Sequence, residues 1–203
     1  MRKTDISAAA GMISPFFTYA CIMVAIGSWK QFSWTDNALS DLGVQSGITA
    51  PVFNIGLIVG GILFVVFAAG MFRYMGKNVV GKAASVLLAV ACIALVCIGI
   101  FNENFHPTHY IVSVMLFVFL PISMLTFVGA FWMEGKRKLS LFTLGLGLFA
   151  AAVWVLQLTL NYVPHVAIPE FTSGLAGSIW VIVLSWQMLK KPETPSYLPA
   201  KSR

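Results

Sequence analysis

Residue types that can do acid–base or metal chemistry occur together in the segment NENFHPTHY, residues 102–110. Glu103, His106 and His109 are three residues apart, so one tight turn presents a carboxylate and two imidazoles. Zinc accepts these ligand types, although the helical HExxH spacing is absent and a further ligand must come from elsewhere. Pro107 suits the first position of a helix, which makes His106 the predicted N-cap and places His109 in the first turn. A helix N-terminus favours the neutral imidazole, the form that binds a metal or accepts a proton.

A further acid lies in the segment DNALSDLG, residues 36–43. Asp36 is a favourable N-cap and Gly43 a favourable C-terminal stop, so the segment predicts a short interfacial helix. Asp41 would then lie in the last turn, where the helix dipole repels an anion. We therefore expect a cation, a histidine or a bound metal opposite Asp41. Its neighbour Ser40 is either a hydrogen-bond donor to a substrate or an ordinary helix residue.

Polar residues also lie between the last two apolar runs. Gln157, Asn161 and His165 follow a four-residue spacing and would share one stripe of a continuing helix, although Pro164 is expected to end that helix first. Glu170 lies in the first turn of the next predicted helix. An acid in this position is either favoured by the helix dipole or serves as a general base. His165 has no comparable structural reason for its position, so it is a candidate ligand.

Two functions fit this set of residues. The first is a membrane-embedded hydrolase that acts on a lipid or other amphiphile through a divalent metal, most simply zinc, which lowers the pKa of a bound water to about 7. The predicted metal ligands are Asp41, His106, His109 and His165, the predicted catalytic residues are Glu103, Glu170 and Ser40, and the predicted substrate-binding residues are Asn54, Gln157 and Asn161. The alternative is a non-catalytic protein that binds or transports a lipid or small solute with the same residues. Haem ligation by two histidines and a structural role with solvated loops are further alternatives.

The elements that must position these residues are membrane helices. The chain has 203 residues, of which 59% are hydrophobic and 10% charged, and a mean hydropathy of +0.87. Apolar runs about as long as the roughly 20 residues needed to cross a bilayer core occupy residues 8–28, 52–72, 83–101, 110–131, 141–160 and 169–189. Their connections are short. We therefore predict an all-α protein with a single six-helix membrane domain over 1–189 and a basic cytoplasmic tail over 190–203.

Basic residues predict the orientation, because they are held on the cytoplasmic side. With the N-terminus inside, 12 of the 13 lysines and arginines are cytoplasmic and Lys30 alone is outside. The first run has full length and no convincing cleavage site, so we expect a retained span rather than a signal peptide. Both termini then face the cytoplasm from the cell membrane, and the predicted site residues face outward. The net charge of +6 suits anionic inner-leaflet lipid rather than nucleic acid, and the absence of charged residues in mid-span disfavours a proton-coupled transporter.

Three segments carry a family resemblance. NALSDLG (37–43), PVFNIGLIVGGILF (51–64) and FHPTHYIVSVMLF (105–117) resemble the six-span membrane proteins grouped as domain of unknown function 998. The resemblance extends from about the first span to the sixth. Its most specific part is the Ser-Asp-Leu-Gly element together with the histidine-containing entry to the fourth span. It implies a six-helix fold and no established activity.

Overall fold

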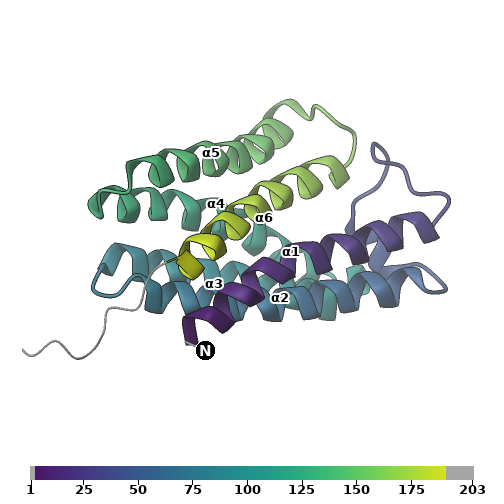
Figure 1. Ribbon diagram of the computed structural model, residues 1–203. Helices are drawn as coiled ribbons and strands as arrows, with labels where there is room; N and C mark the ends of the chain where they lie inside the picture. The colour runs from purple at the N-terminus through teal and green to yellow at the C-terminus, as the bar shows by residue number, and fades with distance from the viewer. Residues whose placement is uncertain (1–2, 191–203) are drawn as a thin grey trace, which may run out of the picture.

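The computed structural model describes residues 3–190, and its regular elements are all helical (Figure 1). The long helices are α1 (Lys3–Ser28), α2 (Thr49–Tyr74), α3 (Val79–Ile100), α4 (Thr108–Met133), α5 (Arg137–Leu160) and α6 (Ala167–Lys190). Two short 3-10 helices, η1 (Ser40–Val44) and η2 (Glu103–Phe105), lie in the connections. All six long helices have the length and apolar composition needed to cross a membrane, which confirms the predicted all-α, six-span fold.

Each long helix begins before the apolar run that predicted it, because helical hydrogen bonds continue through residues that lie outside the apolar run. The start of α3 shows this. Asn78 is its N-cap, and the Asn78 side chain accepts a hydrogen bond from the backbone N–H of Gly81 at 3.0 Å. Beyond Lys190, the predicted basic tail lies outside the described residues.

The six helices form a closed ring. Each packs against the helix before and after it in sequence, and α6 returns to pack against α1 (Figure 1). Consecutive helices run in opposite directions, so the α1–α2 connection lies at the same end of the bundle as the start of α6. This end also carries η1 and η2, and it is called the η1 end below.

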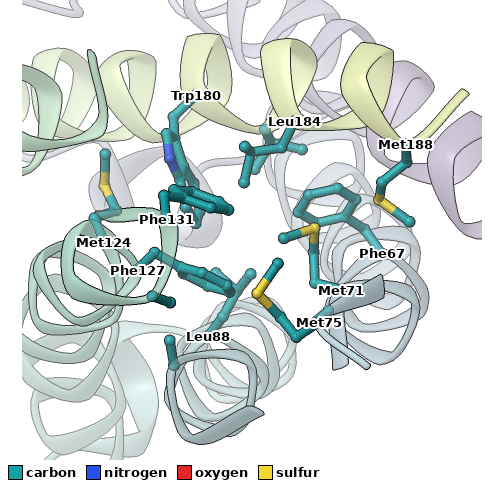
Figure 2. Packing of buried hydrophobic residues seen from close by; sticks show 14 of the residues in the cluster. Phe67, Met71, Met75, Leu88, Met124, Phe127, Phe131, Trp180, Leu184 and Met188 are labelled. Atoms are coloured by element: carbon teal, nitrogen blue, oxygen red, sulfur yellow. The ribbon is translucent and has the colours of Figure 1, made fainter. Parts of the chain in front are cut away.

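The half of the bundle away from the η1 end has a densely packed core. Figure 2 shows side chains from α2, α3, α4 and α6 meeting there, with aromatic and sulfur-containing residues from α2, α4 and α6 and Leu88 from α3. The ring of Trp180 is fully buried, lies 5.3 Å from that of Phe127, and donates a hydrogen bond from its indole nitrogen to Oγ1 of Thr143 at 3.0 Å. This hydrogen bond satisfies the polar atom of the indole, as burial of a tryptophan requires.

Helices α2 and α3 approach each other closely at two glycines. A Cβ at Gly99 would lie 2.7 Å from the backbone oxygen of Asn54 and 3.2 Å from the backbone nitrogen of Ile58. A Cβ at Gly61 would lie 2.6 Å from Cγ2 of Val96 and 3.0 Å from its backbone nitrogen. The absent side chains therefore let the two backbones touch, as small residues do in membrane helix pairs.

Candidate functional site

The α1–α2 connection is anchored to the helix bundle by apolar burial and by amide hydrogen bonds. Leu42 is fully buried and Leu39 is 6% exposed, and both pack with residues of α1, α2, α3 and α6. Nδ2 of Asn54, on α2, donates to the backbone oxygen of Gly43 at 2.9 Å. These contacts hold η1 over the end of the bundle.

The short helix predicted over residues 36–43 is wrong in its extent. The ordered turn is η1, whose N-cap is Leu39 and which includes Gly43 instead of ending there. The Asp36 carboxylate accepts hydrogen bonds from Ser33 at 2.5 Å and Thr35 at 3.0 Å, so it stabilises the preceding turn. Local side-chain hydrogen bonds to an aspartate compete with a helical start in this way.

Asp41 consequently lies in the first turn of η1, not in a last turn. Its Oδ2 accepts hydrogen bonds from Nδ2 of Asn37 at 2.8 Å and from the backbone nitrogen of Ala38 at 3.0 Å. The last-turn position predicted for Asp41 is therefore wrong, and two neutral donors already stabilise its carboxylate. A cation, histidine or metal opposite Asp41 stays a prediction.

Three acids from separate parts of the sequence meet at the η1 end, and we call Asp41, Glu103 and Glu170 the carboxyl cluster. Oγ of Ser40 donates to Oε1 of Glu103 at 2.7 Å. The backbone nitrogen of Leu39 donates to Oε2 of Glu170, at the start of α6, at 2.6 Å. The charges of Asp41 and Glu103 act on each other and on Glu170. Residues 39–41 thus join η2 to the N-terminus of α6.

Partial burial raises the pKa of Glu103 above its ordinary value of 4.5. The hydrogen bond from Ser40 opposes this shift, the negative charge of Asp41 adds to it, and the charge of His109 lowers the pKa by a smaller amount. The folded protein therefore favours a protonated Glu103 more than the unfolded chain does. A carboxyl with a raised pKa next to a second carboxylate is a pattern typical of acid–base sites.

The raised pKa of Glu103 predicts that the stability of the protein depends on pH, and that Glu103→Gln weakens this dependence. Because the pKa of Glu103 is raised on folding, its contribution to stability is fully present below pH 4.5 and is lost as pH rises through the folded-state pKa. We expect Glu103→Gln, which keeps an acceptor for Ser40, to flatten the decline of the thermal midpoint of detergent-solubilised protein between acidic and neutral pH. A variant with the wild-type decline would contradict the assignment.

Asp36→Asn is the matched control for that experiment. Hydrogen bonds from Ser33 and Thr35 lower the pKa of the exposed Asp36 carboxyl, so its contribution to stability is present above its ordinary pKa of 3.8 and lost as pH falls. The difference in midpoint between wild type and Asp36→Asn should therefore change with pH in the direction opposite to that for Glu103→Gln.

The histidines take different positions. Nδ1 of His109 is 2.7 Å from the backbone oxygen of Phe101, to which it donates, and its Nε2 is 3.5 Å from Oγ of Ser113. His106 and His165 are exposed. The predicted N-cap of α4 is wrong by one residue, since Pro107 occupies that position and His106 ends η2 in an extended conformation.

The four predicted metal ligands are not assembled into one site. Within residues 3–190, no group of three or more His, Cys, Asp or Glu side chains is placed to hold a metal ion. The charges of Asp41 and His109 both act on Glu103, while His106 and His165 are exposed. The zinc site accordingly stays a prediction.

The amide residues predicted to bind substrate support the local fold. Nε2 of Gln157, which is 5% exposed, donates to Oδ1 of Asn161 at 3.1 Å and to the backbone oxygen of Val163 at 2.8 Å. Asn161 has a φ of 46° and ends α5 before Pro164 is reached. Asn54 holds η1 through its nitrogen, whereas its buried Oδ1 has no partner among the described residues. A role for any of the three in binding substrate stays a prediction.

A cavity of about 130 Å³ lies in the bundle and reaches the carboxyl cluster. Its wall is mostly apolar and includes Phe53 and Leu57 of α2, Leu95 of α3, Phe117 of α4 and Val181 of α6. Ser40 and Glu170 form part of its wall at the η1 end, and the hydroxyl residues Thr18 and Ser178 line it within α1 and α6. Sequence reasoning missed Thr18 and Ser178, for which the available signal was a hydroxyl within an otherwise apolar run.

These features define the class of protein: a multi-pass helical membrane protein whose bundle encloses an apolar cavity that ends at carboxyl groups. A family model described as "Protein of unknown function (DUF998)" matches residues 12–187, and the chain belongs to this family. The resemblance predicted from the sequence is thereby confirmed. No curated protein and no solved structure matches the chain.

Proposed function

We propose that this protein binds an amphiphile, with the apolar part of the ligand in the bundle cavity and its polar head at the carboxyl cluster. The observation that carries the proposal is the continuity of the cavity, whose wall includes apolar side chains from α2, α3, α4 and α6 together with Ser40 and Glu170. Ligand sites in proteins commonly combine a mainly apolar wall with a few convergent polar groups. An amphiphile has the same division into apolar and polar parts.

The size of the cavity fits part of an apolar chain or ring. An engineered apolar cavity of about 150 Å³ stays dry and binds benzene, and the volume here, about 130 Å³, is similar. Water in such a cavity would meet few hydrogen-bonding partners along the wall, so an apolar occupant is favoured. The same site can serve a binding protein or a transporter.

One observation favours a second function, the hydrolase. The Ser40 hydroxyl donates to Glu103, and Glu103 lies beside Asp41, so a hydroxyl, an acid and a second carboxylate are within reach of the cavity. The two carboxyls have different surroundings, which is how one site obtains an acid and a base. Ester hydrolysis in the purified protein, together with about one metal per chain that is lost in an Asp41→Ala, His106→Ala, His109→Ala variant, would favour the metal-dependent hydrolase.

Filling the cavity is expected to abolish amphiphile binding. Ala91 of α3 lines the cavity and is 1% exposed, so the ring of Ala91→Phe would occupy the space that the ligand needs. We expect radiolabelled dodecyl amphiphiles, supplied as the amine, the alcohol and the carboxylate, to bind wild-type protein in zwitterionic nanodiscs above the level of empty nanodiscs. Ala91→Phe should reduce that binding to the level of empty nanodiscs.

Val86→Phe provides the matched control, because Val86 lies on the same helix and is 53% exposed. It adds more apolar surface on α3 without entering the cavity, and we expect it to bind as wild type does. Equal binding by wild type, Ala91→Phe and Val86→Phe for all three probes would refute the proposed site.

A further inference from the structure

We propose that the amphiphile is a long-chain amine whose protonated head is held by the carboxyl cluster and whose chain carries a second hydrogen-bonding group deeper in the cavity. This inference rests on the proposed function and specifies its ligand. It draws on two independent sets of residues, the acids at the η1 end and the buried hydroxyls along the cavity wall.

The first observation is a concentration of carboxyl groups without a neighbouring lysine or arginine. Three connections lie at the η1 end, residues 29–48, 101–107 and 161–166. The one lysine or arginine among these residues is Lys30, which is exposed. Within residues 3–190, no member of the carboxyl cluster forms an ion pair. A bound cation would favour the ionised forms of Asp41, Glu103 and Glu170, which a neutral or anionic head could not do.

Glu170 offers an acceptor at the cavity itself. Its Oε2 accepts the hydrogen bond from Leu39, whereas its Oε1 receives none from the described residues. Glu170 and Ser40 both line the cavity. An ammonium group has three donors and no acceptor, so it matches carboxylate oxygens and the oxygen of a hydroxyl. A primary amine is protonated at neutral pH, as the side chain of lysine is.

The second observation concerns two hydroxyl residues on the cavity wall, Thr18 and Ser178. Thr18 is 5% exposed, and its Oγ1 has no hydrogen-bond partner in the described structure. Ser178 is 6% exposed and makes no hydrogen bond with another described residue. Both line the cavity. Oγ1 of Thr18, however, packs against Gly60 of α2, which is not part of the cavity wall. Because an unpaired buried hydroxyl is unfavourable, Ser178 is the side chain that indicates an occupant with a polar group at its depth.

The spacing along α6 sets the separation of the two polar groups in the ligand. Ser178 follows Glu170 by eight residues, which is roughly 12 Å along the helix axis at about 1.5 Å per residue. A hydroxyl on about the tenth carbon of a saturated amine would extend to this depth from a head at Glu170.

The test compares three labelled probes in nanodiscs of zwitterionic lipid: dodecylamine, dodecanol and dodecanoate. We expect wild-type protein to bind the amine about tenfold or more tightly than the other two, and Glu170→Gln, which keeps an acceptor for Leu39, to lose that preference while still binding the alcohol. Glu103→Gln should reduce the preference in the same direction. A wild type that binds the alcohol or the carboxylate as tightly as the amine would overturn the assignment of an amine.

The deeper contact is tested with 10-hydroxydodecylamine against dodecylamine. The added hydroxyl should tighten binding to wild type severalfold, and Ser178→Ala should remove the gain without weakening dodecylamine. Thr18→Val should leave the gain in place, because Oγ1 of Thr18 packs against Gly60. No gain in wild type would overturn the second polar contact.

Comparison with Ala91→Phe distinguishes a failure of the amine assignment from a failure of the proposed amphiphile binding. Binding that Ala91→Phe abolishes, but that shows no preference for amine, would retain the proposed function and overturn only this inference. No binding of any probe that depends on the cavity would overturn both.

Discussion

Replacing Trp180 with alanine is expected to lower the free energy of unfolding by about 3–5 kcal/mol. Trp180 is fully buried in the core of the bundle, where it packs between α4 and α6 against Phe127 (Figure 2). In a membrane, lipid is as apolar as the core, so close packing rather than exclusion of water supplies the stabilisation. An alanine would leave a void where an indole filled the space between helices, and it would also leave Thr143 without its hydrogen bond.

The measurement is unfolding of the purified protein by titration of a denaturing detergent, with helix content as the readout. Trp180→Phe separates the two contributions, because it keeps most of the ring packing and loses the hydrogen bond to Thr143, worth about 0.6 kcal/mol in membrane proteins. Trp186→Ala, on the same helix at 52% exposure, is the matched control and should change the stability by about 0.5 kcal/mol or less. Equal losses for the two tryptophans would show that the core does not depend on Trp180.

The second large effect is expected from leucine at Gly99. A Cβ there meets the backbone of Asn54 and Ile58, and backbone cannot move aside as the end of a flexible side chain can. Helices α2 and α3 must therefore move apart to admit the leucine, which we expect to cost about 3 kcal/mol of stability or more. The substitution should also disturb the site, because Asn54 holds η1 through Gly43 and η1 carries Ser40 to Glu103.

Gly99→Leu is best compared with Gly145→Leu, since a Cβ at Gly145 has no atom within 4 Å. Both variants add the same side chain to a membrane helix. We expect Gly99→Leu to lower the thermal midpoint and to weaken binding of the dodecyl probes, and Gly145→Leu to do neither. A Gly99→Leu protein as stable as Gly145→Leu would mean that the α2–α3 contact is looser than the glycines indicate.

Sequence reasoning selected the members of the carboxyl cluster as site residues, but it did not predict the position of each one correctly. Glu103, Glu170, Ser40 and Asp41 were predicted site residues, and the structure brings them together. The histidines followed the zinc pattern equally well, yet His106 and His165 are exposed. The spacing of a short motif does not specify its orientation, because a turn between η2 and α4 can direct a side chain toward solvent or toward a neighbouring helix.

What the sequence by itself determined is the number of the membrane helices and their approximate positions in the chain. An apolar run long enough to cross a bilayer is a local property, and in hydrocarbon a helix satisfies all of its backbone hydrogen bonds within the segment. Each of the six runs therefore predicts its own helix without knowledge of its neighbours. The distribution of basic residues predicts the orientation of these helices in the membrane. That orientation stays a prediction for this chain.

The tertiary structure alone decided which polar groups meet and where the cavity lies. Leu39 and Glu170 are separated by 131 residues and Ser40 and Glu103 by 63, so neither contact has a local signature. The cavity depends on the order in which six helices close into a ring, and on glycines that let some helices approach more closely than others. Non-local packing determines these features, and a single sequence carries no record of which helix face meets which.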